Sequence, residues 1–136
     1  MSNLVLIVDD EHTTQLILKE ILTSEDYSPV ICSDGFAAIE MLQVLEFQLV
    51  ILDLNLPGID GWKVLDYIKA EVHRTSVMLL TGTKDVKTLE YEAYIKNDKY
   101  FSILYKPLNR DELLGKVKNL VKNSLTKNKP KTRLEF

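Results

Sequence analysis

Cysteine is nearly absent from this sequence: Cys32 is the only one, so no disulfide can form within the chain. Such sparse use suits a reducing compartment. Long apolar runs are absent too, since the longest, residues 4–8, is far shorter than the roughly 20 residues that a helix needs to cross a bilayer. The first residues lack the basic and apolar regions of a secretory signal peptide. We therefore expect a cytoplasmic protein that makes no membrane contact.

Low-complexity tracts and internal repeats are also lacking. With 136 residues, 46% of them hydrophobic, the chain fits one domain with its own core. Residues 1–121 carry 12 basic and 19 acidic side chains, whereas residues 122–136 carry five basic and one acidic. The excess of acidic residues in 1–121 suits binding of a cation or a basic partner. We interpret the basic residues 122–136 as a solvated tail rather than a nucleic-acid-binding arm.

The predicted boundaries are a domain at residues 1–124 and a polar, basic tail at residues 125–136. Only about a dozen residues follow the domain, which leaves no room for an output domain. Output is therefore expected to pass through a partner protein, unless the chain is a piece of something longer.

Five short, mainly apolar runs predict five strands, at residues 4–8, 28–32, 49–52, 77–80 and 101–105, of which the first is rich in β-branched residues. A segment with helical spacing follows each run. The predicted helix starts are Thr13 or Thr14, Asp34-Gly35 and the capping box Asn109–Glu112, whose helix runs to about Ser124. The third predicted helix contains Trp62, Val64, Leu65 and Ile68, and the fourth contains Val86. The alternation is typical of an α/β protein: a (βα)5 doubly wound, five-stranded parallel sheet with helices on both faces.

Apolar residues at helical spacing mark the helix faces that we expect to pack on the sheet. They are Leu16, Ile17, Ile21 and Leu22 in the first helix, Phe36, Ala37, Ile39, Met41, Leu42 and Leu45 in the second, and Val86, Leu89, Ala93 and Ile95 in the fourth. Four tyrosines near the fourth helix and fifth strand serve either the core or a partner surface: Tyr91, Tyr94, Tyr100 and Tyr105.

Polar residues follow four of the predicted strands, at the edge where parallel strands present their carboxyl ends. Asp9 and Asp10 follow the first strand, Asp53 the third, Thr81 the fourth and Lys106 the fifth. If the second strand lies at the edge of the sheet, these four ends converge. Three converging carboxylates repel one another and need a counter-charge. Lys106 supplies one charge, and a hard divalent ion bound by oxygens, for which Mg²⁺ is the best match, supplies more.

This set of residues has the parts that phosphoryl transfer needs. Asp53 is the expected nucleophile, because a carboxylate can form an acyl phosphate. Thr81 is expected to hydrogen-bond a phosphoryl oxygen, and Lys106 to pair with its charge. Each residue alone has an ordinary role in turns. The phosphoryl-transfer hypothesis depends on their combination, in which each residue follows a different predicted strand and the residues come in this order along the chain.

Four stretches make the sequence resemble the receiver domain of response regulators in two-component signalling. They are IVDDE at 7–11, ILDLNLPGIDG at 51–61, LLTG at 79–82 and YKP at 105–107, and the resemblance covers residues 3–124. It implies a flavodoxin-like sheet in the order 2-1-3-4-5 and a cis Lys106–Pro107 bond. It also implies a histidine kinase or histidine phosphotransfer protein as phosphoryl donor, and an output partner at the face of the fourth helix, fifth strand and last helix.

The same resemblance assigns residue roles. Asp53 is implied to be the phosphoacceptor, and Thr81 and Lys106 to sense the phosphoryl group. The ligands implied for Mg²⁺, with Mn²⁺ as an alternative, are Asp10 and Asp53 directly, Asp9 through water, and the backbone carbonyl of Asn55. The chain would then be a switch whose only chemistry is its own phosphorylation and dephosphorylation, not an enzyme acting on other substrates.

Two features depart from the family pattern. Residues 97–99 read Asn-Asp-Lys where the family usually has Gly-Ala, and the segment from Thr81 to Lys106 is a few residues longer than usual. Ile103 stands where the family often has a Tyr or Phe that moves with the threonine. Phe101 and Tyr105 fall on the same face of the strand and could replace it. These departures affect the switch readout and leave the phosphorylation chemistry intact.

Two other functions fit parts of the sequence. A haloacid-dehalogenase-type phosphatase uses similar groups, but its nucleophile comes first in the chain and its acidic pair last, the reverse of the order here. A receiver-like docking module that is never phosphorylated would keep the fold without the chemistry. Turnover of a generic phosphate ester would favour the first, and a lack of phosphoryl uptake would favour the second.

Overall fold

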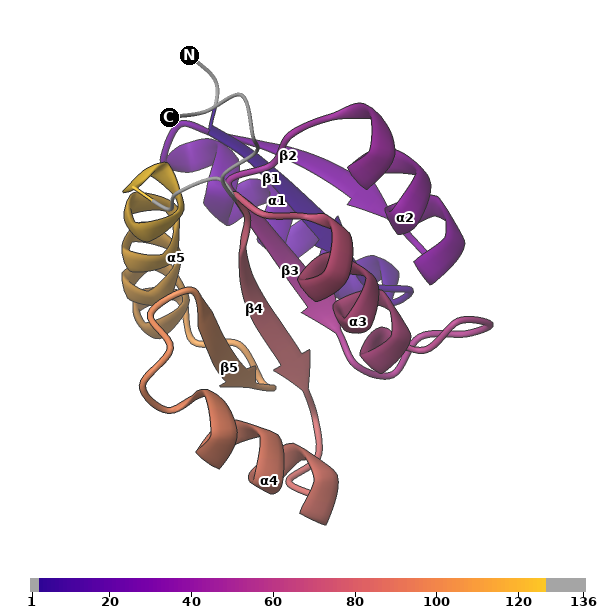
Figure 1. The fold of residues 1–136 in the computed structure, drawn as a ribbon. Coiled ribbons are helices and arrows are strands. Elements are labelled where there is room, and N and C mark those ends of the chain that lie inside the picture. Colours follow the sequence, from indigo (N-terminus) through magenta and orange to yellow (C-terminus); the bar gives the residue numbers. More distant parts are fainter. Residues whose placement is uncertain (1–2, 127–136) are drawn as a thin grey trace, which may run out of the picture.

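The structure, a computed structural model, describes residues 3–126, in which five strands alternate with five helices (Figure 1). The strands form one parallel sheet in the order β2-β1-β3-β4-β5, which confirms the predicted fold. The elements are β1 (Asn3–Val8), α1 (His12–Ser24), β2 (Tyr27–Cys32), α2 (Gly35–Val44), β3 (Leu49–Asp53), α3 (Gly61–Glu71), β4 (Ser76–Thr81), α4 (Val86–Ile95), β5 (Phe101–Tyr105) and α5 (Arg110–Thr126). The predicted basic tail lies outside the described residues from 127 onward.

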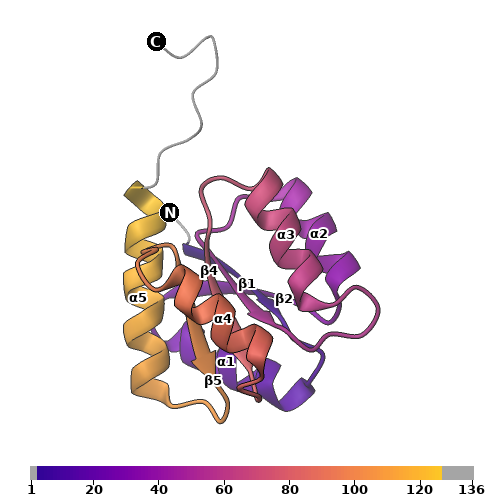
Figure 2. The ribbon, with the colours of Figure 1, turned by 60° about the horizontal axis from the view of Figure 1, so that its bottom comes forward.

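The sheet separates two hydrophobic cores. Helices α2, α3 and α4 cover one face of the sheet, and α1 and α5 cover the other (Figures 1 and 2). In β1, Leu6 and Val8 enter the first core, whereas Val5 and Ile7 enter the second. The central strands are buried on both faces, which is why their sequences are continuously apolar rather than alternating.

Helix α1 differs from the prediction in its start and in its buried face. It begins at His12, with Glu11 at the N-cap position, so neither Thr13 nor Thr14 caps it. Leu16 and Ile17 were expected in the core but are 51% and 43% exposed. The buried face instead consists of Thr14, Gln15, Leu18, Ile21 and Leu22. The polar pair faces inward because Thr14 hydrogen-bonds the Glu11 side chain and Gln15 hydrogen-bonds the Asp9 carbonyl just after β1.

Helix α4 is rotated relative to the prediction. Ile95 is buried as expected, but its buried companion is Thr88. Val86 and Leu89, expected in the core, are 71% and 47% exposed, and Ala93 is exposed as well. These three residues recur at helical spacing, so they form an apolar stripe on the solvent side of α4.

Ring packing accounts for this rotation and allows it to be tested. Tyr91 lies on the inner side of α4, where its ring meets the Trp62 ring of α3 edge-to-face at 5.3 Å. We expect Val86→Ala to change the free energy of unfolding by less than about 0.5 kcal/mol. Ile95→Val, which removes one buried methylene, should lower it by about 0.5–1.5 kcal/mol. Urea unfolding measures both, and a larger loss at Val86 than at Ile95 would contradict the rotation.

Helix α2 begins as predicted, with Asp34 as its N-cap accepting a 2.8 Å hydrogen bond from the first turn. Its buried face is narrower than predicted: Ala38 and Leu42 are buried, whereas Phe36 and Leu45 are 62% and 39% exposed. The exposed Phe36 ring is therefore not part of the core.

Helix α5 also begins as predicted, since Asn109 Oδ1 accepts a 2.9 Å hydrogen bond from the backbone N–H of Glu112. Within residues 3–126, no helix combines the length and hydropathy needed to span a bilayer. The fold thus places the carboxyl ends of β1, β3, β4 and β5 along one edge of the sheet.

Candidate functional site

Three carboxylates meet at the carboxyl-terminal edge of the sheet, as the sequence predicted. Asp9 and Asp10 directly follow β1, and Asp53 ends the neighbouring strand β3. One oxygen atom from each of these side chains lies within 4.8 Å of the others. Asp9 and Asp53 are buried, at 0% and 4% exposure, whereas Asp10 is exposed. The cluster therefore joins two buried carboxylates to one that faces solvent.

Lys106, which follows β5, brings its ammonium group to this cluster. Its Nζ lies 3.2 Å from Asp9 Oδ2, 3.5 Å from Asp53 Oδ2 and 3.9 Å from Glu11 Oε1. Burial acts to lower the pKa of Lys106, but the carboxylates of Asp53 and Asp9 outweigh it, and the pKa lies above its usual value. Lys106 is thus charged at neutral pH. The Lys106–Pro107 bond is cis, as predicted.

The Asp53 carboxylate has two different neighbours. Its Oδ1 accepts a 2.9 Å hydrogen bond from the backbone N–H of Asn55, and its Oδ2 faces Lys106. Burial raises the pKa of Asp53 above its usual value, and the charge of Asp9 adds to this rise. The Asn55 N–H and Lys106 oppose the rise without cancelling it. The Asn55 N–H and Lys106 therefore offset only part of the cost of keeping a negative charge on Asp53.

The cluster fits a hard divalent cation. Among residues 3–126, Asp9 Oδ2 is one of two buried side-chain atoms without a hydrogen bond, although it lies 3.2 Å from Lys106 Nζ. Such atoms are uncommon in native structures. Three carboxylates facing one ammonium also leave an excess of negative charge. Oxygen ligands of this kind suit Mg²⁺, which binds through few carboxylates and keeps several waters.

Thr81 reaches the same edge of the sheet as the last residue of β4. Its carbonyl accepts a 2.8 Å hydrogen bond from the backbone N–H of Lys106, which ties the two strand ends together. Its hydroxyl, however, is engaged in a local turn: Oγ1 donates to the Thr83 carbonyl and accepts from the Thr83 N–H, both at 3.1 Å. The phosphoryl contact of Thr81 stays a prediction and would require this hydroxyl to rotate.

Gln15 supports the site and was missed by the sequence reasoning. It is 8% exposed in α1, and its Nε2 donates to the Asp9 carbonyl at 2.5 Å and to Ser33 Oγ at 3.0 Å. This side chain ties α1 and the loop after β2 to the strand end that carries Asp9. The only signal for it in the sequence was a polar residue close to an apolar helical stripe.

Gly61 also supports the site, although the sequence showed it only as part of a turn. A Cβ atom at this position would lie 2.4 Å from the carbonyl oxygen of Asp53 and 2.5 Å from the Cα of Leu54. Its own N–H donates to the Leu54 carbonyl at 3.2 Å. The first turn of α3 can approach the end of β3 this closely only because glycine has no side chain.

Known proteins share this sequence pattern. A family model described as the response regulator receiver domain matches residues 5–118. The chain is 32% identical over 118 residues to the transcriptional activator protein IrlR of Burkholderia pseudomallei, covering 87% of the chain and 50% of IrlR. It is 26% identical over 118 residues to sporulation initiation phosphotransferase F of Bacillus subtilis, covering 87% of the chain and 93% of that protein. The chain thus spans about half the length of IrlR and of the other transcriptional regulators that it matches.

Solved structures share the fold. The signal receiver domain of a putative Luxo repressor protein from Vibrio parahaemolyticus is 28% identical, with a TM-score of 0.82 over 93% of this chain and 95% of that one. The signal receiver domain of an HD domain-containing protein from Pseudomonas fluorescens Pf-5 is 26% identical, with a TM-score of 0.83 over 93% and 100% of the two chains.

Proposed function

Because the chain belongs to the response regulator receiver domain family of two-component systems, we propose that it is a phosphoacceptor switch in which Asp53 takes a phosphoryl group from a histidine kinase or histidine phosphotransfer protein. The observation that carries this proposal is the meeting of Asp9, Asp10 and Lys106 around the buried carboxylate of Asp53. A purely structural set of strand-end residues would not require three carboxylates at one point. The proposed extent of the receiver unit is residues 1–124.

The proposed reaction moves one phosphoryl group. An Asp53 carboxylate oxygen forms a bond to phosphorus while the bond from phosphorus to the donor imidazole nitrogen breaks, and its electron pair stays on the imidazole. Lys106 pairs with the negative charge that arrives on the phosphoryl oxygens. Thr81, once its hydroxyl leaves Thr83, donates a hydrogen bond to one of them. Attack by water later returns the carboxylate and releases inorganic phosphate.

Asp9, Asp10, Asp53 and the backbone carbonyl of Asn55 would hold the divalent ion, Mg²⁺ or Mn²⁺. The chemistry that such an ion supplies when bound is neutralisation of the charge shared by the carboxylates and the phosphoryl oxygens. Asp9 is buried and Asp10 exposed, so Asp10 lies on the side from which the ion and the phosphoryl donor would enter.

We propose a signalling switch rather than an enzyme with other substrates. The order of the motifs and the family match give no support to a haloacid-dehalogenase-type phosphatase. A docking module without phosphorylation would not need to retain Asp53, Thr81 and Lys106 together. The cellular location is proposed to be the cytoplasm, where a histidine kinase presents its phosphohistidine.

The proposed output surface is the face formed by α4, β5 and α5. Val86 and Leu89 give α4 an exposed apolar stripe. Ile103 is 6% exposed and packed in the core, whereas Tyr105 shares its face of β5 and donates a 2.9 Å hydrogen bond to Glu92 of α4. Tyr105 is therefore our candidate for the aromatic residue that links β5 to α4.

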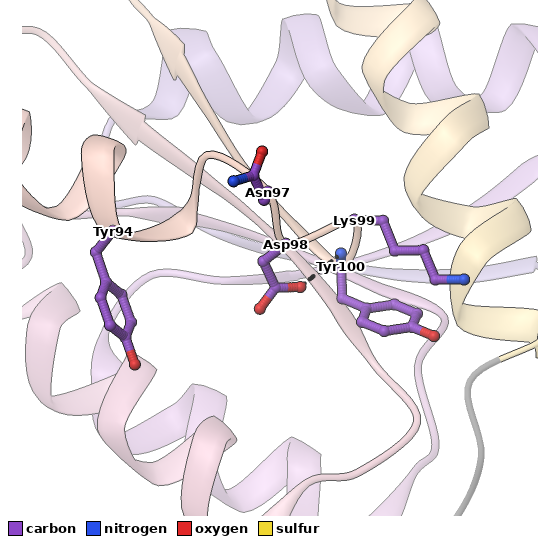
Figure 3. A pocket seen from close by; sticks show the side chains of 5 residues that line it. All are labelled: Tyr94, Asn97, Asp98, Lys99 and Tyr100. Carbon is purple, nitrogen blue, oxygen red and sulfur yellow. Dashed lines mark hydrogen bonds between the residues drawn. The ribbon is translucent and has the colours of Figure 1, made fainter.

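The segment that departs from the family pattern forms an open notch beside this surface. It measures about 560 Å³ and is lined by Tyr94, Asn97, Asp98, Lys99 and Tyr100 (Figure 3). Figure 3 shows Tyr94 and Tyr100 on opposite sides, with the Asp98 carboxylate between them accepting a 3.0 Å hydrogen bond from the Tyr100 N–H. We include this notch in the proposed contact area of the output partner.

Incubation of the chain with acetyl phosphate and Mg²⁺ tests the proposed function. We expect intact mass to show one added phosphoryl group that hydroxylamine removes, as an acyl phosphate requires. Omitting Mg²⁺ and adding EDTA should prevent the gain. No gain in the presence of Mg²⁺, from either acetyl phosphate or a phosphorylated histidine kinase, would contradict the proposal and favour the docking module.

Removal of the exposed ligand should weaken metal binding without unfolding the domain. We expect Asp10→Ala to lower the Mg²⁺ affinity at least about tenfold, because a direct carboxylate ligand is lost. Because Asp10 is exposed and the neighbouring carboxylates repel it, its removal should not lower the free energy of unfolding of the metal-free protein. Isothermal titration with Mg²⁺ measures the affinity. Asp66→Ala, on the exposed side of α3, is the control and should bind Mg²⁺ like the wild type.

A further inference from the structure

Phe36 is a large apolar side chain with no place in either core. It lies in the first turn of α2 and is 62% exposed. Its ring nevertheless has a defined neighbour: a Cβ atom built at Gly58 would lie 3.6 Å from Phe36 Cε2 and 3.9 Å from Cδ2. Gly58 belongs to the β3–α3 loop, which connects Asp53 to Gly61. The exposed ring thus lies beside one exposed residue of the loop that leaves the carboxylate cluster.

This loop is held differently at its two ends. Its inner end is fixed by hydrogen bonds, from the N–H of Leu54 to the Leu80 carbonyl at 3.0 Å and from the N–H of Asn55 to Asp53 Oδ1 at 2.9 Å. Its outer part turns through Gly58, which has a φ of +74° and so adopts the left-handed conformation that favours glycine. Asn55 and Gly58 are separated by Leu56 and Pro57, and Leu56 is 8% exposed.

The start of α2 forms the wall against which the outer part packs. A Cβ atom at Gly35 would lie 2.8 Å from the Ile59 carbonyl oxygen and 2.9 Å from Val64 Cγ2, so α2 approaches both the loop and α3 without space between them. Phe36 extends this contact to Gly58. Figure 1 shows the loop reaching out beside the start of α2. Two of its side chains, Leu56 and Ile59, pack against the first core.

We propose that Phe36 is a positioning residue for the metal site. Its ring holds the outer part of the β3–α3 loop, and through it the Asn55 carbonyl, in the orientation that binding of a divalent ion requires. Mg²⁺ demands near-ideal octahedral geometry, so a loop free to shift loses affinity for it. This inference depends on the proposed function for the role of Asn55, and it adds a residue that touches neither the ion nor the phosphoryl group.

The test compares Phe36→Ala with Val44→Ala, a smaller truncation of an apolar side chain at a 76% exposed position at the other end of α2. We expect Phe36→Ala to weaken Mg²⁺ binding about tenfold in isothermal titration, the lower end of the effect of removing a supporting residue. Amide hydrogen exchange of residues 58–60 in the metal-free protein should become faster. Val44→Ala should change neither quantity, and Phe36→Leu should recover most of the affinity.

Each outcome bears on one claim. Unchanged Mg²⁺ affinity and unchanged exchange in Phe36→Ala would overturn the positioning role. Faster exchange with unchanged affinity would also overturn it, because the loop would then be held by Phe36 without consequence for the ion. A wild-type chain that binds Mg²⁺ but takes up no phosphoryl group would contradict the proposed function alone, since affinity and exchange still decide the role of Phe36.

Discussion

Asp53→Asn is expected to abolish phosphoryl uptake. The amide keeps the size of the carboxylate, and its oxygen can still accept the hydrogen bond from the backbone N–H of Asn55. It is not a nucleophile at neutral pH, so no acyl phosphate can form. Intact mass after incubation with acetyl phosphate and Mg²⁺ measures the loss. Asp66→Asn, at an exposed position in α3, is the matched control and should be phosphorylated like the wild type. A phosphoryl group retained by Asp53→Asn would exclude Asp53 as the acceptor.

Asp53→Asn should also abolish phosphorylation without lowering the stability of the fold. Burial raises the pKa of Asp53 in the folded state, so folding at neutral pH disfavours the anion relative to the unfolded chain. Replacing the anion by a neutral amide removes this penalty and the repulsion from Asp9, and loses only the pairing with a partly exposed lysine. In EDTA, urea unfolding should therefore find the variant at least as stable as the wild type. A clear loss of stability would mean that the Lys106 pair outweighs burial.

Gly61→Ala, at the first residue of α3, is expected to be the most damaging small substitution near the end of β3. The new Cβ would lie 2.4 Å from the Asp53 carbonyl oxygen and 2.5 Å from the Leu54 Cα. Both are backbone atoms, so the contact can be relieved only by moving α3 away from the strand. We expect a loss of about 3 kcal/mol in the free energy of unfolding, the upper end of the usual effect of overpacking. Phosphorylation by acetyl phosphate should be slower as well, because the displaced backbone carries Asp53.

Gly115→Ala supplies a control with the same change in composition. Gly115 is exposed in α5, and a Cβ atom there meets no atom within 4 Å. Alanine is the better helix former, so this variant should be about 0.5–1 kcal/mol more stable than the wild type and equally phosphorylated. Urea unfolding of the two variants should thus give changes of opposite sign. A Gly61→Ala variant as stable as the wild type would contradict the close packing of α3 on β3.

The sequence alone determined the order of the strands and helices along the chain and predicted that Asp9, Asp10, Asp53 and Lys106 meet at one edge of the sheet. The central strands are buried on both faces, so each appears as an unbroken apolar run. The residue after such a run is carried to the sheet edge by chain connectivity. Asp10 and Lys106 could therefore be placed beside Asp53 without coordinates, although they lie 43 and 53 positions away from it in the chain.

Which side of each helix is buried was decided only by the tertiary structure. Apolar spacing predicted Leu16 and Leu89 in the core, yet both are about half exposed, while Gln15 and Thr88 are buried. The free energy of burying one more leucine is only about 1.5–3 kcal/mol. Fixed partners on neighbouring elements can outweigh it, as the Asp9 carbonyl does for Gln15. Such partners come from strands and loops distant in sequence, so no periodicity within the helix records them. For the same reason, the sequence does not show how closely Gly61 approaches β3, or that a turn engages the Thr81 hydroxyl. Packing between elements fixes both.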